Sequence, residues 1–163
     1  MSKQVQDLES VLQMLVAEHR KLVESLDLQQ TAMNKFDLKA IERLSVEHEA
    51  IRGRIALLDK RRRMLVVQIA RLARLEGEPP LSKLAALHPQ RGPSLLKLRD
   101  ELKPLVEQVR RRAYIAARVA GAVLGHVNTA MRLLAGAVGK AGVYTKTGLP
   151  RSPERIGVMN AVG

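Results

Sequence analysis

One long stretch in the second half of the sequence decides the fold. Residues 95–138 read LLKLRDELKPLVEQVRRRAYIAARVAGAVLGHVNTAMRLLAGAV. Apolar or small side chains recur there in alternating steps of three and four. They form a row that we call the first seam: Leu95, Leu98, Leu102, Leu105, Val109, Ala116, Val119, Val123, Ala130, Leu133 and Ala137, interrupted at Arg112 and His126. This spacing keeps one side of a helix apolar and is typical of coiled-coil-like packing. The rest of the chain must supply the partner helices.

A second apolar row joins the first seam near the end of this stretch. This row, the second stripe, consists of Leu124, Val127, Met131, Leu134 and Val138. Two interpretations are open. Either this end of the helix is more deeply buried in the bundle, or the second stripe is a docking face for another protein.

Two earlier segments carry the same pattern. The spacing from Val5 to Leu26 predicts a helix over about residues 3–33, and the spacing from Ile41 to Leu72 predicts a second helix over about 37–76. Gly77 and the two prolines after it are expected to end the second helix. The turn between the two helices is short, so they should form an antiparallel hairpin, with Phe36 packed beneath the turn.

A proline-rich connector separates this hairpin from the last helix. Ser82 is expected to cap a turn or two of helix within it, and Gly92-Pro93 to open a long helix over about 93–139. Pro104 should kink that helix or mark the end of a shorter segment.

The overall prediction is an all-α protein with one main domain. We predict an elongated three-helix antiparallel bundle with coiled-coil-like packing over residues 1–142. Glycines and prolines beyond Gly139 predict a flexible C-terminal tail over 143–163.

Composition limits the kinds of function that the chain can perform. The chain has 163 residues, 46% of them hydrophobic, which is enough for one domain with a core. Aromatic residues make up 2%, which argues against base stacking. Cysteine is absent, so disulfides and thiolate chemistry are excluded. The start lacks a signal-peptide pattern and no apolar run reaches about 18 residues, so we predict no membrane insertion.

Charge is distributed unevenly along the chain. Residues 1–50 hold 6 basic and 9 acidic side chains, a net −3, whereas residues 51–163 hold 22 basic and 7 acidic, a net +15. A basic segment of this kind suits nucleic acid, anionic lipid, an acidic protein surface, or simple solvation. The arginine triplets at 61–63 and 110–112 fan out around their helices, and no nucleic-acid-binding motif accompanies them. We therefore predict no nucleic-acid partner, and the purpose of the charge stays open.

Polar residues on the seams are the candidates for chemistry. His19, His48 and His126 each occupy a seam position, but none has a carboxylate or second histidine one turn away on the same seam. We interpret them as a polar layer that sets the helix register. Arg62 is expected to pair with Asp7 or Glu9 across the hairpin. We predict no catalytic, cofactor-binding or metal-binding residues, and no enzymatic activity.

Several short motifs resemble those of a known family. They are Ala32, Asp37-Leu38, Glu47 to Leu58, Asp59-Lys60-Arg61-Arg62, Met64-Leu65-Val66, the row Leu98, Leu102, Leu105 and Val109, and the segment Tyr144-Thr145-Lys146-Thr147-Gly148, which is similar to Tyr-x-x-x-Gly. In this order they resemble the FlgN family of flagellar export chaperones. The resemblance implies a cytoplasmic α-helical chaperone of the flagellar type III export system. Such a chaperone binds the hook-associated junction proteins, between hook and filament, and delivers them to the export gate.

The resemblance also suggests roles for individual residues. Tyr144 matches the tail tyrosine that docks on the export-gate protein in that family. The second stripe is then the candidate client-binding surface. The alternative function is a basic coiled-coil stalk or escort component of the export ATPase, and a weaker one is a nucleic-acid-associated helical protein. Whether the free chain forms a homodimer stays open.

Overall fold

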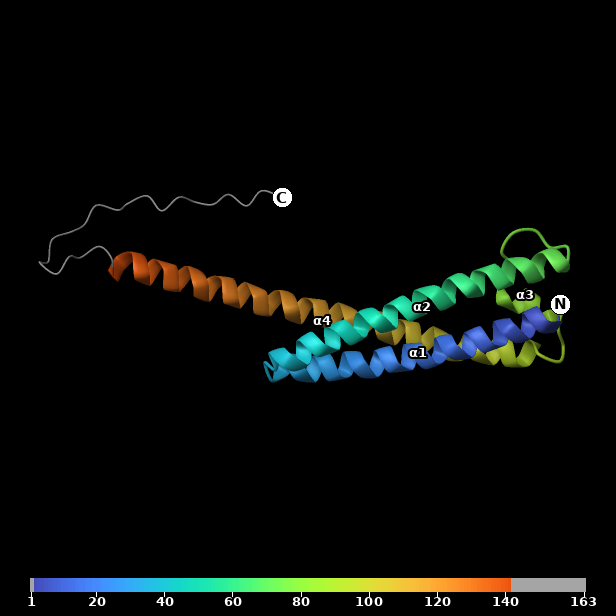
Figure 1. Cartoon of the computed structure of the whole chain (residues 1–163), viewed down its shortest axis with the longest axis horizontal. Helices are drawn as coiled ribbons and strands as arrows, with labels where there is room; N and C mark the ends of the chain where they lie inside the picture. The colour runs from blue at the N-terminus through green and yellow to red at the C-terminus, as the bar shows by residue number, and fades with distance from the viewer. Residues whose placement is uncertain (1, 142–163) are drawn as a thin grey trace, which may run out of the picture. The chain divides into compact units, whose positions relative to one another are not determined.

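The computed structural model describes residues 2–141, and all secondary structure in that range is helical. The four helices are α1 (Ser2–Asn34), α2 (Leu38–Leu72), α3 (Leu81–Ala86) and α4 (Gly92–Ala141), as Figure 1 shows. The predicted all-α class is confirmed, but the predicted count of three helices is wrong, because the connector forms the additional short helix α3. The chain divides into two compact units, of which the first is Met1–Val119 and the second begins at Ala120.

In the first unit, α1 and α2 form the predicted antiparallel hairpin. Gln29 Nε2 donates to Ser45 Oγ at 3.4 Å near the turn, and Arg54 Nε lies 2.9 Å from Glu18 Oε2 further along. The first part of α4 runs parallel to α1, because Arg20 pairs with Glu101 at 3.1 Å, whereas Arg112 lies further along α4 and pairs with Asp27. The three long helices therefore follow an up-down-up order in this unit.

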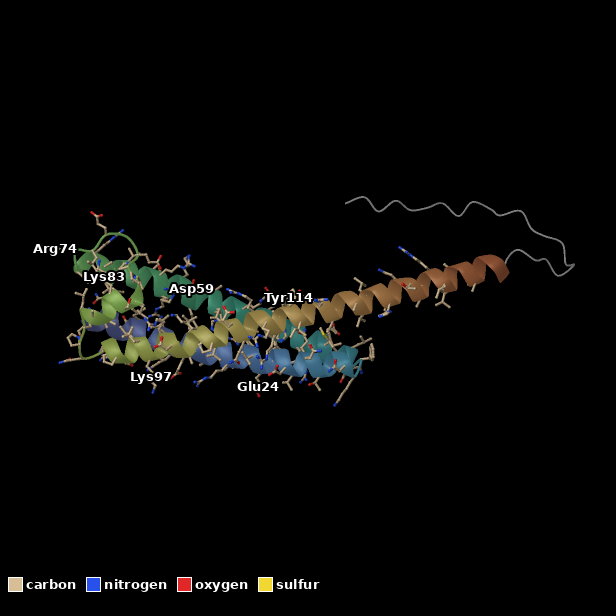
Figure 2. The ribbon with its side chains drawn as sticks, turned by 180° about the vertical axis from the view of Figure 1, so that it is seen from behind. Glu24, Asp59, Arg74, Lys83, Lys97 and Tyr114 are labelled. Atoms are coloured by element: carbon tan, nitrogen blue, oxygen red, sulfur yellow. The ribbon has the colours of Figure 1, made fainter. Side chains whose placement is uncertain are left out.

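The core of the first unit lies where all four helices meet. Its buried members are Val5, Leu8, Val11, Leu12 and Leu15 of α1, Leu65, Val66 and Ile69 of α2, Leu84 of α3 and Leu95 of α4. A smaller cluster nearer the α1–α2 turn contains Leu22, Leu26 and Ile51, with Val109 of α4 packed against it. Charged side chains such as Glu24 and Lys97 lie on the outer surface (Figure 2).

The turn after α1 reverses the chain without glycine. The Asp37 N–H donates to the Ala32 carbonyl at 3.0 Å and the Phe36 N–H to the Met33 carbonyl at 3.1 Å, while Phe36 has a φ of 54°. This is a Schellman motif with phenylalanine in the left-handed position, where glycine is usual. The expectation that Phe36 packs beneath the turn is wrong: its side chain is 71% exposed, because the residue sits at the outside of the reversal. Asp37 then caps α2, accepting from the Ala40 N–H at 3.1 Å.

α2 ends earlier than the sequence pattern predicts. Its last residue is Leu72, and the left-handed residue is Arg74, with a φ of 53°. The Leu75 N–H donates back to the Ala70 carbonyl at 2.8 Å, and the Leu75 side chain packs on the core. Because the Schellman motif places this leucine in the core, α2 ends before Gly77 is reached.

The connector is held tightly between α3 and α4. Pro80 occupies the N-cap position of α3, so Ser82 lies inside the helix and does not cap it as predicted. Gly92 opens α4, and a Cβ atom built on it would lie 2.3 Å from the carbonyl oxygen of Ala85. Only glycine allows this close approach. α4 then continues through Pro104 as one helix, so the predicted alternative of a separate shorter segment is not realised.

A partly buried carboxylate ties the start of α4 to α1. Glu9 accepts hydrogen bonds from the Ser94 hydroxyl and from the Arg91 guanidinium, and its side chain is only 15% exposed. The Ser94 hydrogen bond, followed by the Arg91 hydrogen bond and charge, lowers the pKa of Glu9, although burial acts in the opposite direction.

We expect Gly92→Ala to destabilise the first unit by about 1–3 kcal/mol, because the new methyl group must displace the backbone of α3. Urea unfolding followed by circular dichroism measures the change. Gly53→Ala is the matched control: a Cβ there meets nothing within 4 Å, and inside α2 the change should stabilise by about 0.5–1 kcal/mol. Equal stability of the two variants would contradict the close approach.

We expect Glu9→Gln to lower the free energy of unfolding by about 1 kcal/mol at pH 7. The folded-state pKa of Glu9 lies below its unfolded-state value of about 4.3. The contribution of this carboxylate to stability is therefore complete above the unfolded-state pKa and is lost as the pH falls through the folded-state pKa. The difference between wild type and variant should therefore shrink below about pH 4. Urea titrations from pH 3 to 7 test this. Glu107→Gln, at a side chain 64% exposed, is the control and should change little at any pH.

Candidate helix-docking surface on α4

Within the first unit, the first seam anchors α4 against the other helices. Leu95 is fully buried, Val109 packs on the smaller cluster, and Ala116 is 8% exposed. Arg112, which interrupts the seam, lies with its Nε 2.6 Å from Asp27 Oδ1. The sequence offered no partner for this arginine, because Asp27 is 85 residues away. This part of α4 is therefore structural.

From Leu124 onward, the apolar side chains of α4 are exposed to solvent. The exposed fractions are 61% for Leu124, 48% for Val127, 63% for Met131, 66% for Leu134 and 71% for Val138. The interpretation of the second stripe as deeply buried core is therefore wrong for the chain by itself. Leu133 of the first seam is also 70% exposed, which the sequence pattern did not predict.

The geometry of the second stripe suits contact with a helix. At about 100° per residue, its five members fall within an arc of about 80°, and from Leu124 to Val138 they extend over about 21 Å of helix. An exposed apolar surface of this kind is typical of an interaction site. The surface is a ridge on a single helix, so a partner must supply the complementary groove or seam.

Two exposed apolar residues beside the first seam were missed by the sequence analysis. Tyr114 is 62% exposed and Ile115 is 45% exposed, both in the first unit. The Arg118 guanidinium lies 5.8 Å from the centre of the Tyr114 ring and covers one face of it. Their only signal in the sequence is that both fall off the three-four spacing of the first seam.

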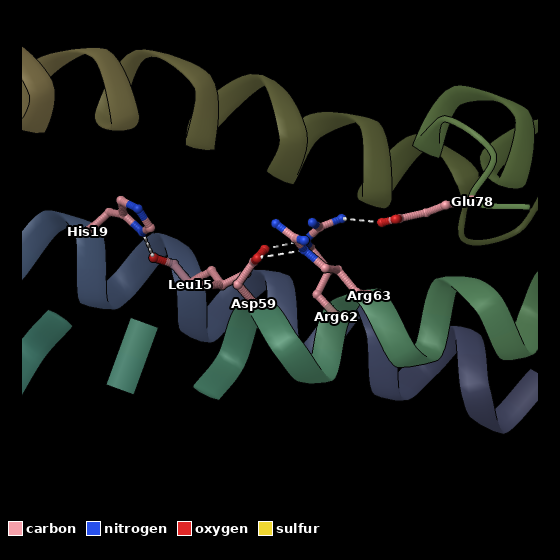
Figure 3. Close-up of polar contacts among 6 residues, drawn as sticks. All are labelled: Leu15, His19, Asp59, Arg62, Arg63 and Glu78. Atoms are coloured by element: carbon pink, nitrogen blue, oxygen red, sulfur yellow. Dashed lines mark hydrogen bonds and ion pairs between the residues drawn. The ribbon is translucent and has the colours of Figure 1, made fainter. Parts of the chain in front are cut away.

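The histidines do not form the predicted polar layer. His19 Nδ1 lies 2.7 Å from the carbonyl oxygen of Leu15 in its own helix, as Figure 3 shows. His126 is exposed. Within residues 2–141, no group of three or more His, Asp or Glu side chains is placed to hold a metal ion. The histidine positions therefore suggest no shared chemistry.

Arg62 is paired, but not with Asp7 or Glu9 as expected. Its Nε lies 2.8 Å from Asp59 Oδ1 and its Nη1 3.8 Å from Glu78 Oε1, while Arg63 Nε lies 2.9 Å from Asp59 Oδ2 (Figure 3). Burial raises the pKa of Asp59, but the two arginines outweigh it and the net shift is downward. Two arginines of the triplet at 61–63 thus face carboxylates of the same chain.

Two further expectations concern the end of the chain and the membrane. Tyr144, the predicted export-gate residue, and the predicted tail at 143–163 lie outside the described residues. In the part of the chain that the structure describes, no helix has the length and apolar character needed to cross a bilayer.

Comparison with known proteins places this architecture in a family. No curated protein and no solved structure matches the chain. The family model described as FlgN protein matches residues 1–152, which include all four helices and the whole second stripe. The chain therefore belongs to the FlgN family of flagellar export chaperones.

Proposed function

We propose that this chain binds flagellar hook-filament junction subunits through the second stripe and delivers them to the type III export gate. The observation that carries the proposal is the solvent exposure of five apolar side chains at helical spacing on one face of α4. Family membership supplies the class of client. The chaperone would act in the cytoplasm, before export.

The mechanism is the packing of an amphipathic client helix against α4. Such helices are prone to self-association, and a transient apolar partner keeps them apart until assembly. Burial of four side chains such as Leu124, Val127, Met131 and Leu134 contributes on the order of 6–10 kcal/mol before ordering costs are subtracted. Micromolar binding corresponds to about 8 kcal/mol, so these four side chains alone give weaker binding than that once the costs are subtracted, which allows release at the gate.

Delivery requires a second contact, with the export gate. We assign this contact to Tyr144, on the basis of its match to the family's tail tyrosine. Since Tyr144 lies after α4, client and gate would be held by neighbouring parts of the chain. The gate could then receive the client directly from the chaperone.

We expect the double variant Met131→Asp, Leu134→Asp to lose junction-subunit binding, because two carboxylates in the second stripe would have to be desolvated on docking. The tagged full-length chain should recover junction subunits from the native cytoplasm, as identified by mass spectrometry, and the double variant should not. Circular dichroism should show unchanged helicity, since both positions are exposed.

Gly125→Asp is the matched control. It introduces the same charge at an exposed position on the side of α4 away from the second stripe, and it should leave recovery unchanged. Equal recovery by the double variant would refute the assignment of the surface. Recovery of export-ATPase subunits alone by the wild-type chain would favour the stalk or escort function.

A further inference from the structure

The described part of the second unit presents two exposed apolar rows, not one. The second stripe is the first of these. The other is the continuation of the first seam: Val123, Ala130, Leu133 and Ala137. Of these four, Val123 is partly exposed, while the other three are exposed, Leu133 to 70%.

The two rows point in different directions from the helix axis. At about 100° per residue, the second stripe is centred about 90° away from the continued first seam. A helix in a bundle contacts two neighbouring helices. The directions from its axis to these neighbours are roughly 60° apart in a triangular arrangement and roughly 90° apart in a square one. A single docked helix would cover one row and leave the other in water.

The second stripe is confined to the end of α4. Its steps of three and four, taken backwards from Leu124, pass through the small residues Ala120, Ala117 and Ala113. They then reach Arg110, Lys103 and Arg99, with only Val106 between them, so large apolar side chains line this row only from Leu124 onward. In the first unit, the first seam alone is enough to pack α4 on the chain's own helices. A second row that begins where this packing is complete therefore indicates an additional neighbour.

Charge argues against a second copy of this chain as that neighbour. Residues 108–153 contain no Asp or Glu, and their basic residues are Arg110, Arg111, Arg112, Arg118, Arg132, Lys140, Lys146 and Arg151. Contact between two copies of this segment would place like charges together with no carboxylate in the segment to pair with them. Arg132, for example, has Asn128, Thr129, Ala135 and Gly136 as its neighbours one turn away, and none of them is acidic.

We propose that the end of α4 docks two helices of one client molecule at the same time, one on each row, and that these helices carry acidic residues beside their apolar seams. The inference rests on the proposed function, because it specifies how the junction subunit is held. The complex would be a small intermolecular bundle in which α4 supplies one helix and the client supplies two. Pairing two client helices on one chaperone helix would keep both from premature assembly.

Leu133 and Leu134 provide a matched test, because they are adjacent leucines of similar exposure that belong to different rows. The dissociation constant of the purified junction subunit for the full-length chain is measured by isothermal titration calorimetry. We expect Leu133→Asp and Leu134→Asp each to raise it by about tenfold or more, and Gly125→Asp, on the side of α4 away from both rows, to leave it unchanged. Circular dichroism verifies that all three variants keep their helicity.

Hydrogen exchange of the bound client gives an independent readout. We expect two separate helical segments of the junction subunit to gain protection on binding, and Leu133→Asp to remove protection from one of them. A single protected segment, together with an unchanged dissociation constant for Leu133→Asp, would overturn the two-helix inference and leave the proposed function intact. Failure of the wild-type chain to bind the junction subunit would instead overturn the proposed function.

Self-association is tested in the same preparations. Light scattering after size exclusion should show a monomer at micromolar concentration. A dimer that Leu133→Asp dissociates without a change in client affinity would assign the continued first seam to a second copy and overturn the inference.

Discussion

The first unit depends on the burial of one apolar seam along α4. A long amphipathic helix cannot shield its own apolar side, so α1, α2 and α3 must assemble around it. Leu95 is fully buried in the cluster that also contains Leu84 of α3 and the apolar face at the start of α1. Each fully buried leucine stabilises the fold by about 1.5–3 kcal/mol, more than any surface ion pair contributes. The close approach of Gly92 to Ala85 follows from this packing, because α3 and α4 are joined by a short connector.

Ion pairs between α1 and residues 91–112 set the direction and register in which α4 packs on α1. A seam of leucines is nearly repetitive, so a shift of one helical turn would still bury apolar area. Glu9, Arg20 and Asp27 of α1 meet Arg91, Glu101 and Arg112 in the same order along the chain. Exposed pairs of this kind stabilise little, but a shifted alignment would break all three and strand Glu9, whose side chain is mostly buried. The three ion pairs therefore contribute more to the specificity of the alignment than to stability.

The functional consequence is that α4 carries apolar side chains beyond the part of the first seam that packs in the first unit. An exposed apolar row on a helix promotes non-specific association, and a chaperone that presents one needs some protection against it. The net charge of +12 opposes contact between copies. Residues 108–153 also contain no carboxylate that could pair with the basic side chains of another copy. This suggests a reason for the basic character of the second half that does not involve nucleic acid. The same charge would favour a client with acidic residues beside its apolar face.

The sequence by itself determined the helical class, the hairpin and the start of α4 at Gly92-Pro93. These features follow from local periodicity and backbone chemistry, which short stretches of sequence carry in full. Tertiary structure alone decided that Arg112 pairs with Asp27, that Arg62 turns to Asp59 and Glu78, and that Arg74 ends α2 before Gly77. It also decided that the second stripe is exposed, because an apolar row has the same spacing whether another helix covers it or not. Burial depends on which segments of the chain are near, and no local pattern carries that information.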